Sequence, residues 1–292
     1  MNKGEIKMSE KQVWLVTGCS TGFGRELAKY LLENDYRVVV TARNSEKVQD
    51  LVEINPENAV SFNLDVTDKA QIQHVVAKAE EHFGAIDVLV NNAGFGYFGA
   101  IEESVEPEVR SMFETNFWGL AEMTRAVLPG MRARRSGTIV NISSIGGFVG
   151  FPGVGYYNAT KFAVNGFSEA LQKEVAPLGI KVLVVQPSGF RTDWAGRSAN
   201  DAPHTIADYA ETAGANQAAI RGYSGNQPGD PVRAAKAIVK AVESENPPLN
   251  LLLGRAALKN ARLRLEGLQK DFDDWADVSE GADFPDESAA AS

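Results

Sequence analysis

The chain has 292 residues, of which 44% are hydrophobic and 23% are charged, as is usual for a folded globular protein. Its formal net charge of −9 would repel nucleic acid and anionic lipid, so we expect neither as a general partner. A single cysteine, Cys19, excludes an intrachain disulfide. The histidines His74, His82 and His204 form no pair at metal-ligand spacing, so we predict no metal site.

The termini are polar, and no apolar run has the length of a membrane span. Because the first ten residues lack the apolar core of a signal peptide, we predict a cytoplasmic protein in which residues 1–10 are disordered. No Pro/Gly-rich linker divides the rest, which favours one domain over residues 11–278. We expect the acidic tail, residues 279–292, to be disordered.

Short β-branched runs alternate with amphipathic segments, which is the pattern of parallel strands joined by helices. The expected strands are 13–16, 37–41, 59–64, 87–90, 138–142, 180–186 and 249–253. The expected helices include 24–33, 69–83 and 157–175, and another begins near Pro231. Residues 188–230, rich in glycine and polar side chains, are predicted to form a substrate-loop insertion. The fold class is therefore α/β, with about seven mainly parallel strands and helices on both faces of the sheet.

A glycine-rich turn follows the first expected strand and precedes a helix, with the sequence Thr17-Gly18-Cys19-Ser20-Thr21-Gly22-Phe23-Gly24. Glycines at such a turn let backbone N–H groups approach a pyrophosphate, and the helix N-terminus adds a favourable dipole. Tight turns also use glycine for steric reasons alone, so the motif needs support from elsewhere.

The end of the second expected strand gives that support. An acidic residue about 20 residues beyond the glycines would bind the ribose 2′-hydroxyl of NAD, but here the strand ends in Ala42-Arg43. A guanidinium suits a 2′-phosphate, so we predict NADP (NADPH) as the cofactor; a solvated arginine is the alternative interpretation. Asp65 and the turn Asn91-Asn92-Ala93-Gly94, which follow the next two strands, are expected to line the same cofactor.

Tyr157 and Lys161 lie four residues apart on an expected helix and share one face of it. A lysine ammonium and the positive nicotinamide of the oxidised cofactor both favour the phenolate and lower a tyrosine pKa that is ordinarily about 10, so Tyr157 is the candidate acid/base. The pair follows the fifth strand, and ligands of open α/β sheets bind at the carboxyl ends of strands. Ser144, at that end, is expected to hydrogen-bond a substrate carbonyl, although a turn or helix-cap serine is the alternative.

Taken in order, these motifs resemble the branch of the short-chain dehydrogenase/reductase family that carries a TGxxxGxG turn. The resemblance is strong over about residues 11–192 and implies a Rossmann-type, doubly wound sheet. It implies an oxidoreductase that interconverts a small-molecule carbonyl and an alcohol, with Tyr157 as general acid/base. Lys161 would hold the nicotinamide ribose, Ser144 would orient the carbonyl, and Asn116 would sustain a water-linked proton relay through a helix kink.

One departure concerns the loop after the sixth strand, where the family commonly has glycine after Pro187 and this chain has Ser188. Thr192 still fits the family's contact to the nicotinamide carboxamide. The predicted catalytic residues are Asn116, Ser144, Tyr157 and Lys161. The predicted cofactor-binding residues are Gly18, Ser20, Thr21, Gly22, Phe23, Gly24, Arg43, Asp65, Val66, Asn92, Ala93, Gly94, Tyr157, Lys161, Pro187, Gly189 and Thr192.

Other functions compete with this interpretation. A non-catalytic NADP(H)-binding redox sensor would be favoured by a missing tyrosine or lysine, but both are present. The sugar-nucleotide epimerases and dehydratases share the Tyr-x-x-x-Lys pair, but they usually have a longer C-terminal domain and another glycine spacing. Helices expected over 106–134 and 157–175 carry apolar residues on more than one side, which predicts a homodimer or homotetramer.

Overall fold

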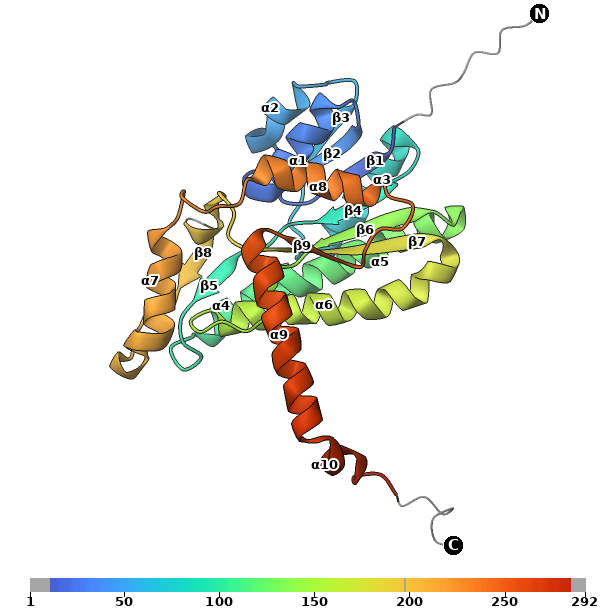
Figure 1. The fold of residues 1–292 in the computed structure, drawn as a ribbon. Helices are drawn as coiled ribbons and strands as arrows, with labels where there is room; N and C mark the ends of the chain where they lie inside the picture. Colours follow the sequence, from blue (N-terminus) through green and yellow to red (C-terminus); the bar gives the residue numbers. More distant parts are fainter. Residues whose placement is uncertain (1–10, 197, 285–292) are drawn as a thin grey trace, which may run out of the picture.

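The computed structural model describes residues 11–196 and 198–284. Seven parallel strands form one sheet in the order β3-β2-β1-β4-β6-β7-β9, with helices on both faces (Figure 1). The strands are β1 (Val13–Val16), β2 (Arg37–Ala42), β3 (Ala59–Asn63), β4 (Val88–Asn91), β6 (Gly137–Ile142), β7 (Ile180–Pro187) and β9 (Asn250–Leu253). The expected α/β fold, a Rossmann-type doubly wound sheet, is therefore confirmed, and no end of these strands differs from the prediction by more than one residue.

Two apolar layers cover the sheet because successive side chains of a strand point to opposite faces. Trp14 and Val16 belong to the layer under one set of helices, whereas Leu15, between them, belongs to the other. The first set is α1 (Gly22–Glu33), α2 (Gln49–Val52) and α8 (Pro231–Val242), and the second is α3 (Lys69–Phe83), α5 (Leu120–Arg134) and α6 (Gly155–Val175). Within the described residues, no helix is long and apolar enough to cross a membrane.

The strand order reverses at β1, which lies between β2 and β4. The chain crosses to one side of β1 for the first strands and to the other side for all later ones. The connections that follow β1 and β4 therefore part at this point and leave a crevice at the carboxyl edge of the sheet. This is where the glycine turn and the Asn92 turn lie.

The sequence analysis missed several elements. A second, two-stranded sheet pairs β5 (Gly96–Phe98) with β8 (Ala199–Asp201). β8 and helix α7 (Ala215–Gly222) both lie inside the expected insertion, residues 188–230. Strands of three residues carry too little pattern to be recognised. The helical stretch expected over 106–134, by contrast, is present: α4 (Glu106–Phe113) continues into a π-helical turn, η2 (Glu114–Gly119), and then into α5.

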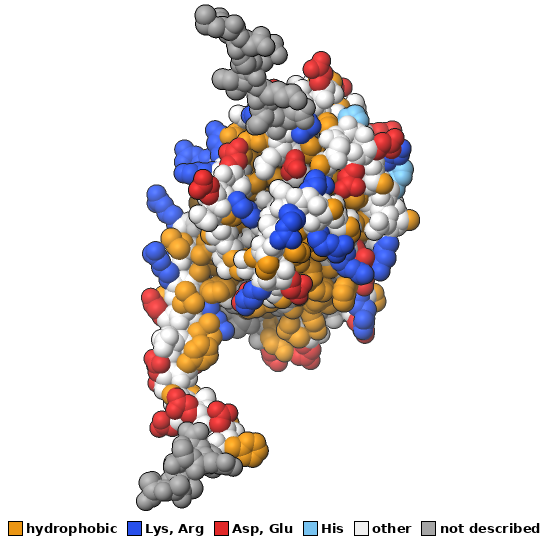
Figure 2. Space-filling model, turned by 90° about the vertical axis from the view of Figure 1, so that its right-hand side faces the viewer, with side chains coloured by type: hydrophobic (Ala, Val, Ile, Leu, Met, Phe, Trp, Pro, Cys, Tyr) orange, Lys and Arg blue, Asp and Glu red, His pale blue; other side chains and the backbone are white. Residues whose placement is uncertain are grey.

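The C-terminal region also differs from the prediction. Helix α9 (Arg255–Asp274) was not identified from the sequence, and α10 (Ala276–Glu280) crosses the boundary expected at 278. Ser279 and Glu280, assigned to the disordered tail, are therefore helical. The distal part of α9 projects from the body of the molecule and carries hydrophobic side chains (Figures 1 and 2). Residues 1–10 and 285–292, on which the other terminal predictions fall, lie outside the described residues.

Candidate active site

A cavity of about 860 Å³ lies at the carboxyl edge of the sheet. Its wall includes the residues that directly follow β1, β4, β6 and β7, and it extends to residues of α6, α7 and α9. Every predicted cofactor-binding residue except Gly24 lines this cavity, and so do Ser144, Tyr157 and Lys161 among the predicted catalytic residues. Segments far apart in the sequence thus meet around one space.

The glycine turn forms one wall of the cavity. Gly18 and Gly22 have φ angles of +71° and +63°, which residues with a side chain rarely adopt. A Cβ on Gly18 would also lie only 3.0 Å from the Cα of Ala93. Helix α1 begins at Gly22 with no side-chain cap from Thr21 and no acidic residue in its first turn. Its first N–H groups are therefore suited to an anionic group such as a pyrophosphate.

Gly24 serves packing and is not among the described residues that line the cavity, so its assignment as a cofactor contact stays a prediction. A Cβ there would lie 2.6 Å from the carbonyl oxygen of Gly18 and against the Asn92 amide. That amide donates hydrogen bonds to the carbonyl oxygens of Thr17 and Gly18, at 2.8 and 3.0 Å. The absence of a side chain at Gly24 lets the turn after β4 pack closely against the turn after β1.

Where the cavity reaches the end of β2, it is lined by the basic side chain of Arg43. This side chain is exposed and forms no ion pair with any described residue. The nearby Arg25, by contrast, is paired with Asp50. Asp65 accepts hydrogen bonds from the N–H and the hydroxyl of Thr67, at 2.9 and 2.7 Å, which fixes its carboxylate at the cavity wall. A free guanidinium at this place is chemically suited to a phosphate monoester.

Tyr157, Lys161 and Ser144 converge in the interior of the cavity. The Lys161 ammonium donates a hydrogen bond to the carbonyl oxygen of Ile142 at 2.8 Å and lies 5.7 Å from the centre of the Tyr157 ring. Ser144 caps a short helical turn, because its hydroxyl oxygen accepts a hydrogen bond from Gly146 N–H at 3.0 Å. As an acceptor in that bond, Ser144 keeps its own proton available for donation.

Burial dominates the ionisation of both groups. It raises the pKa of Tyr157 to about 12, against an opposing hydrogen bond from Ser144, and it lowers the pKa of Lys161 to about 8. Without the cofactor, the pKa of Tyr157 is thus raised and not lowered, because desolvation of the phenolate outweighs the hydrogen bond from Ser144. The lowering expected from the sequence also invoked the positive nicotinamide of the oxidised cofactor, and it stays a prediction for the complex. With these pKa values, Tyr157 keeps its proton at neutral pH and Lys161 is mostly charged.

Asn116 does not line the cavity. Its amide lies in the η2 turn, accepts a hydrogen bond from Phe95 N–H at 3.0 Å, and donates to the carbonyl oxygen of Phe95 and to the hydroxyl of Thr160, at 2.9 and 3.2 Å. Thr160 in turn donates to the carbonyl oxygen of Tyr157 at 2.7 Å. The expected helix kink is thus a π-helical turn. The side chain of Asn116 links two segments near the site, and its role in a proton relay stays a prediction.

Ser188, where the family commonly has glycine, lines the cavity and is bonded to the last residue of β9. Its N–H and its hydroxyl both donate to the carbonyl oxygen of Leu253, at 3.0 and 3.3 Å. The space for this hydroxyl exists because the next residue after Leu253 is Gly254, where a Cβ would collide with the Ser188 oxygen. The larger residue is therefore accommodated away from the cavity centre.

Cys19 lies within the glycine turn but is fully buried and does not line the cavity. Its thiol donates to the carbonyl oxygen of Val16, and burial raises its pKa to about 12. Since the thiolate is the reactive form of cysteine, this residue is not a nucleophile for covalent catalysis.

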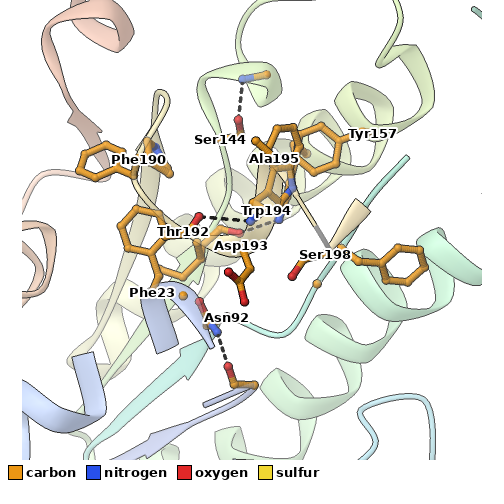
Figure 3. A pocket seen from close by; sticks show the side chains of 18 of the residues that line it. Phe23, Asn92, Ser144, Tyr157, Phe190, Thr192, Asp193, Trp194, Ala195 and Ser198 are labelled. Carbon is orange, nitrogen blue, oxygen red and sulfur yellow. Dashed lines mark hydrogen bonds between the residues drawn. The ribbon is translucent and has the colours of Figure 1, made fainter. Parts of the chain in front are cut away.

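Sequence reasoning missed the apolar end of the cavity. The Trp194 ring packs beside that of Tyr157, with the ring centres 4.9 Å apart (Figure 3). The other apolar side chains here include Phe95, Val154 and Ile220, which come from three separate segments. None of them belongs to a local motif, so only the assembled fold reveals them.

The comparisons with known proteins agree with this geometry. The model of the short chain dehydrogenase family matches residues 12–203. "Oxidoreductase BOA17" from Botryotinia fuckeliana is 38% identical, over 92% of this chain and 98% of its own length. The 3-ketodihydrosphingosine reductase from Bacteroides thetaiotaomicron is 40% identical, over 84% of this chain and 88% of its own.

Solved structures show the same relationship. A short-chain dehydrogenase from Streptomyces avermitilis is 44% identical, with a TM-score of 0.89 over 94% of this chain and 99% of its own. The structure of ElxO with NADP bound is 30% identical, with a TM-score of 0.70 over 85% of this chain and 99% of its own. Family model, relatives and fold therefore agree, and the chain belongs to the short chain dehydrogenase family, as an oxidoreductase.

Proposed function

We propose that the protein is an NADP(H)-dependent oxidoreductase that interconverts a ketone or aldehyde and an alcohol, with Tyr157 as general acid/base. One observation carries this proposal: Tyr157, Ser144 and Lys161 meet in a cavity that is also lined by Arg43, which forms no ion pair with any described residue. A proton donor, a carbonyl-orienting hydroxyl and a phosphate-binding cation thus share one continuous space.

The residues present fit a dinucleotide. The first N–H groups of α1 would bind its pyrophosphate, and Arg43 its 2′-phosphate, while Asp65 and Val66 would line the adenine. The turn after β4 and the segment from Pro187 to Thr192 would enclose the nicotinamide end. The neighbour ElxO, solved with NADP bound, supports this choice of cofactor.

The bound nicotinamide would supply or accept the hydride. Tyr157, protonated at neutral pH, would donate its proton to the carbonyl oxygen as the alcohol forms. The Ser144 hydroxyl would donate a hydrogen bond to the same oxygen and stabilise its developing negative charge. Lys161, charged below about pH 8, would stabilise the phenolate that remains and contact the nicotinamide ribose.

The substrate is, in this proposal, a neutral carbonyl compound with an apolar body. The cavity wall includes the apolar side chains of Phe95, Val154, Trp194 and Ile220, which belong to one cluster with Tyr157, beside polar ones such as Asn200 and Asn216. Arg43 and Lys161 are the only basic side chains that line the cavity within the described residues, and both would contact the cofactor. A carboxylate or phosphate on the substrate would therefore find no basic partner among the residues around the substrate. The relative named as a 3-ketodihydrosphingosine reductase supports a ketone with a long apolar chain.

The remaining proposals concern assembly and location. Trp118 and Phe162, which are 52% and 44% exposed, lie on the η2 turn and on α6. They support the expected homodimer or homotetramer through that face. A cytoplasmic location and a small-molecule partner remain part of the proposal.

The test is to follow NADPH and NADH oxidation, in parallel, against a panel of ketones, aldehydes and diketones. We expect turnover with a higher kcat/KM for NADPH, and Arg43→Ala should reduce that preference by roughly tenfold or more, because a charge-assisted contact is worth about 1.5–3 kcal/mol. Equal kcat/KM for both cofactors would refute the NADP assignment. Tight NADPH binding without turnover on any substrate would favour the redox-sensor alternative.

A further inference from the structure

Helix α9 contacts the body of the protein along its first turns only. Ala257 and Ala261 are buried there, in a small cluster with Ile145 and the partly buried Phe148 and Val149. Beyond Ala261 the helix continues for 13 residues, to Asp274, which corresponds to about 20 Å at 1.5 Å per residue. This distal part projects from the body (Figure 1).

An apolar stripe runs along the projecting part on the face that begins with Ala257 and Ala261. Its members are Leu265, Leu268 and Phe272, and Trp275 follows directly after the last residue of the helix, at a spacing of three, four and three residues. Such spacing keeps side chains on one side of a helix and is typical of surfaces that pack against another helix. Leu265, Phe272 and Trp275 are 56%, 63% and 64% exposed and Leu268 is half-buried, so most of the stripe is uncovered within the described residues.

The charges on α9 and α10 are segregated along the axis. The proximal part, up to residue 264, carries Arg255, Lys259, Arg262 and Arg264, and none of these forms an ion pair with a described residue. The part after residue 264 carries Glu266, Lys270, Asp271, Asp273, Asp274, Asp277 and Glu280, of which Lys270 is paired with Asp274. The helix is therefore positive at its start and negative at its end.

We propose that two copies of the chain associate through α9, with the two helices antiparallel. This arrangement places the basic half of each helix against the acidic half of the other, whereas a parallel pair would oppose like charges. With Leu265 opposite Leu268 of the partner subunit, Ala261 is opposite the partner subunit's Phe272. In that register Arg264 lies at the edge of the stripe next to Asp271 of the partner subunit, and the symmetry of the pair repeats this contact.

The charge pattern favours a second copy over a membrane as the occupant of the stripe. Helices that lie on anionic lipid carry basic residues beside their whole apolar face, but α9 and α10 carry four aspartates, two glutamates and one lysine after Leu265. The pairing also bears on the site, since Ala256 and Asn260, on the first turns of the same helix, line the cavity. A partner helix on α9 would therefore lie beside the cavity mouth.

The test is sedimentation velocity of the full chain at micromolar concentration. Leu265→Lys should halve the assembly mass, or weaken association at least tenfold, because it places a charge in the stripe. Leu263→Lys is the matched control, since Leu263 is 53% exposed but two residues away and thus on the opposite side of the helix. If the chain also associates through another face, the wild-type assembly is larger, but Leu265→Lys should still halve its mass. Unchanged mass for Leu265→Lys, or equal loss for both variants, would overturn the proposal.

A charge exchange tests the antiparallel register. Arg264→Asp and Asp271→Arg should each weaken association severalfold, and the double variant should recover it, because both intersubunit pairs are restored with opposite sign. Residues 264 and 271 are two turns apart on one helix, so a contact within the chain cannot explain such recovery. Additive losses in the double variant would contradict this register.

A flotation assay with vesicles of phosphatidylcholine and phosphatidylglycerol tests the competing occupant. The wild-type chain should remain with the unbound protein, and Leu265→Lys should leave that distribution unchanged. Vesicle binding that Leu265→Lys abolishes, together with no change in assembly mass, would assign the stripe to lipid and overturn self-association. Circular dichroism of each variant should match the wild type, because every substituted side chain is exposed.

Discussion

At the scale of single residues, Tyr157 is distinguished by its surroundings rather than by its type. The chain has seven tyrosines, but Tyr157 combines burial, the neighbouring Ser144 hydroxyl and a lysine one helical turn away. Burial keeps its proton bound at neutral pH, so the reductive direction finds the donor already in the required form.

Replacing Tyr157 with phenylalanine keeps the ring and removes only the proton donor. We expect kcat for carbonyl reduction to fall by at least about 10²–10⁴-fold, which is the usual contribution of general acid catalysis. The affinity for NADPH, measured by fluorescence, should change little. Tyr156→Phe is the matched control, because this neighbour does not line the cavity, and it should keep near wild-type turnover. Near wild-type reduction by Tyr157→Phe would disprove the mechanism.

The pKa of Lys161 predicts a pH dependence. Because burial lowers it to about 8, the ammonium is charged below that pH and loses its proton as the pH rises through it. The profile of kcat/KM for NADPH reports the free enzyme, so it should decline above about pH 8. Tyr157, with a pKa of about 12, contributes no change in this range. A profile that stays flat from pH 6 to 10 would show that the charge of Lys161 does not matter.

At the scale of elements, the side chain of Asn116 joins the η2 turn to Phe95 and to Thr160 through hydrogen bonds. Asn116→Ala would leave both backbone groups of Phe95 and the Thr160 hydroxyl without this partner. We expect the free energy of unfolding, measured in urea, to fall by roughly 2–4 kcal/mol, since buried polar groups left unpaired cost about 1–3 kcal/mol each. Glu114→Ala, an exposed change in the same turn, should cost little.

The same variant separates positioning from chemistry. Because Thr160 is bonded to the carbonyl of Tyr157, Asn116→Ala should lower kcat by shifting α6, with a small effect on NADPH affinity. The decline of kcat/KM near pH 8 should persist, since Lys161 is retained. Loss of that decline would instead indicate that Asn116 takes part in proton transfer.

The strands could be predicted from the sequence because their signal is local. Runs such as Val182 to Val185 are apolar throughout, as strands covered on both faces must be. The residues assigned to the site by motif, except Gly24 and Asn116, also line the cavity, since the turns after β1, β4 and β6 are fixed by strand order. Two kinds of information were not local. Trp194 reaches Tyr157 only through the pairing of β5 with β8, and the raised tyrosine pKa depends on burial by the whole fold.

At the scale of the molecule, side chains of several segments meet in one cavity. The end proposed for the substrate includes Phe95, Trp194 and Ile220, and the only basic residues among the described ones that line the cavity are Arg43 and Lys161. We therefore expect kcat/KM to rise along a series of methyl ketones of increasing chain length, by up to about fourfold per methylene, since each buried CH₂ contributes about 0.8 kcal/mol. Steady-state kinetics would measure this.

The matched control is the same series with a terminal carboxylate. Burying that charge without a partner is costly, so these ketones should gain little from added length. If the carboxylates were the better substrates, the assignment of an apolar substrate body would be wrong. This outcome would leave the hydride-transfer chemistry untouched.

The order of the strands also bears on how the protein is made. From β1 the sheet grows first to β2 and β3, and then, on the other side, through β4, β6, β7 and β9 in the order of the chain. During synthesis, each new strand of the main sheet thus finds a pairing edge that has already emerged from the ribosome. β7 stays an open edge of the sheet until its neighbour β9, residues 250–253, has been made. All but one of the side chains of β7 are buried in the finished fold, so this edge is apolar. A chain cut before Asn250 should therefore aggregate in the cell.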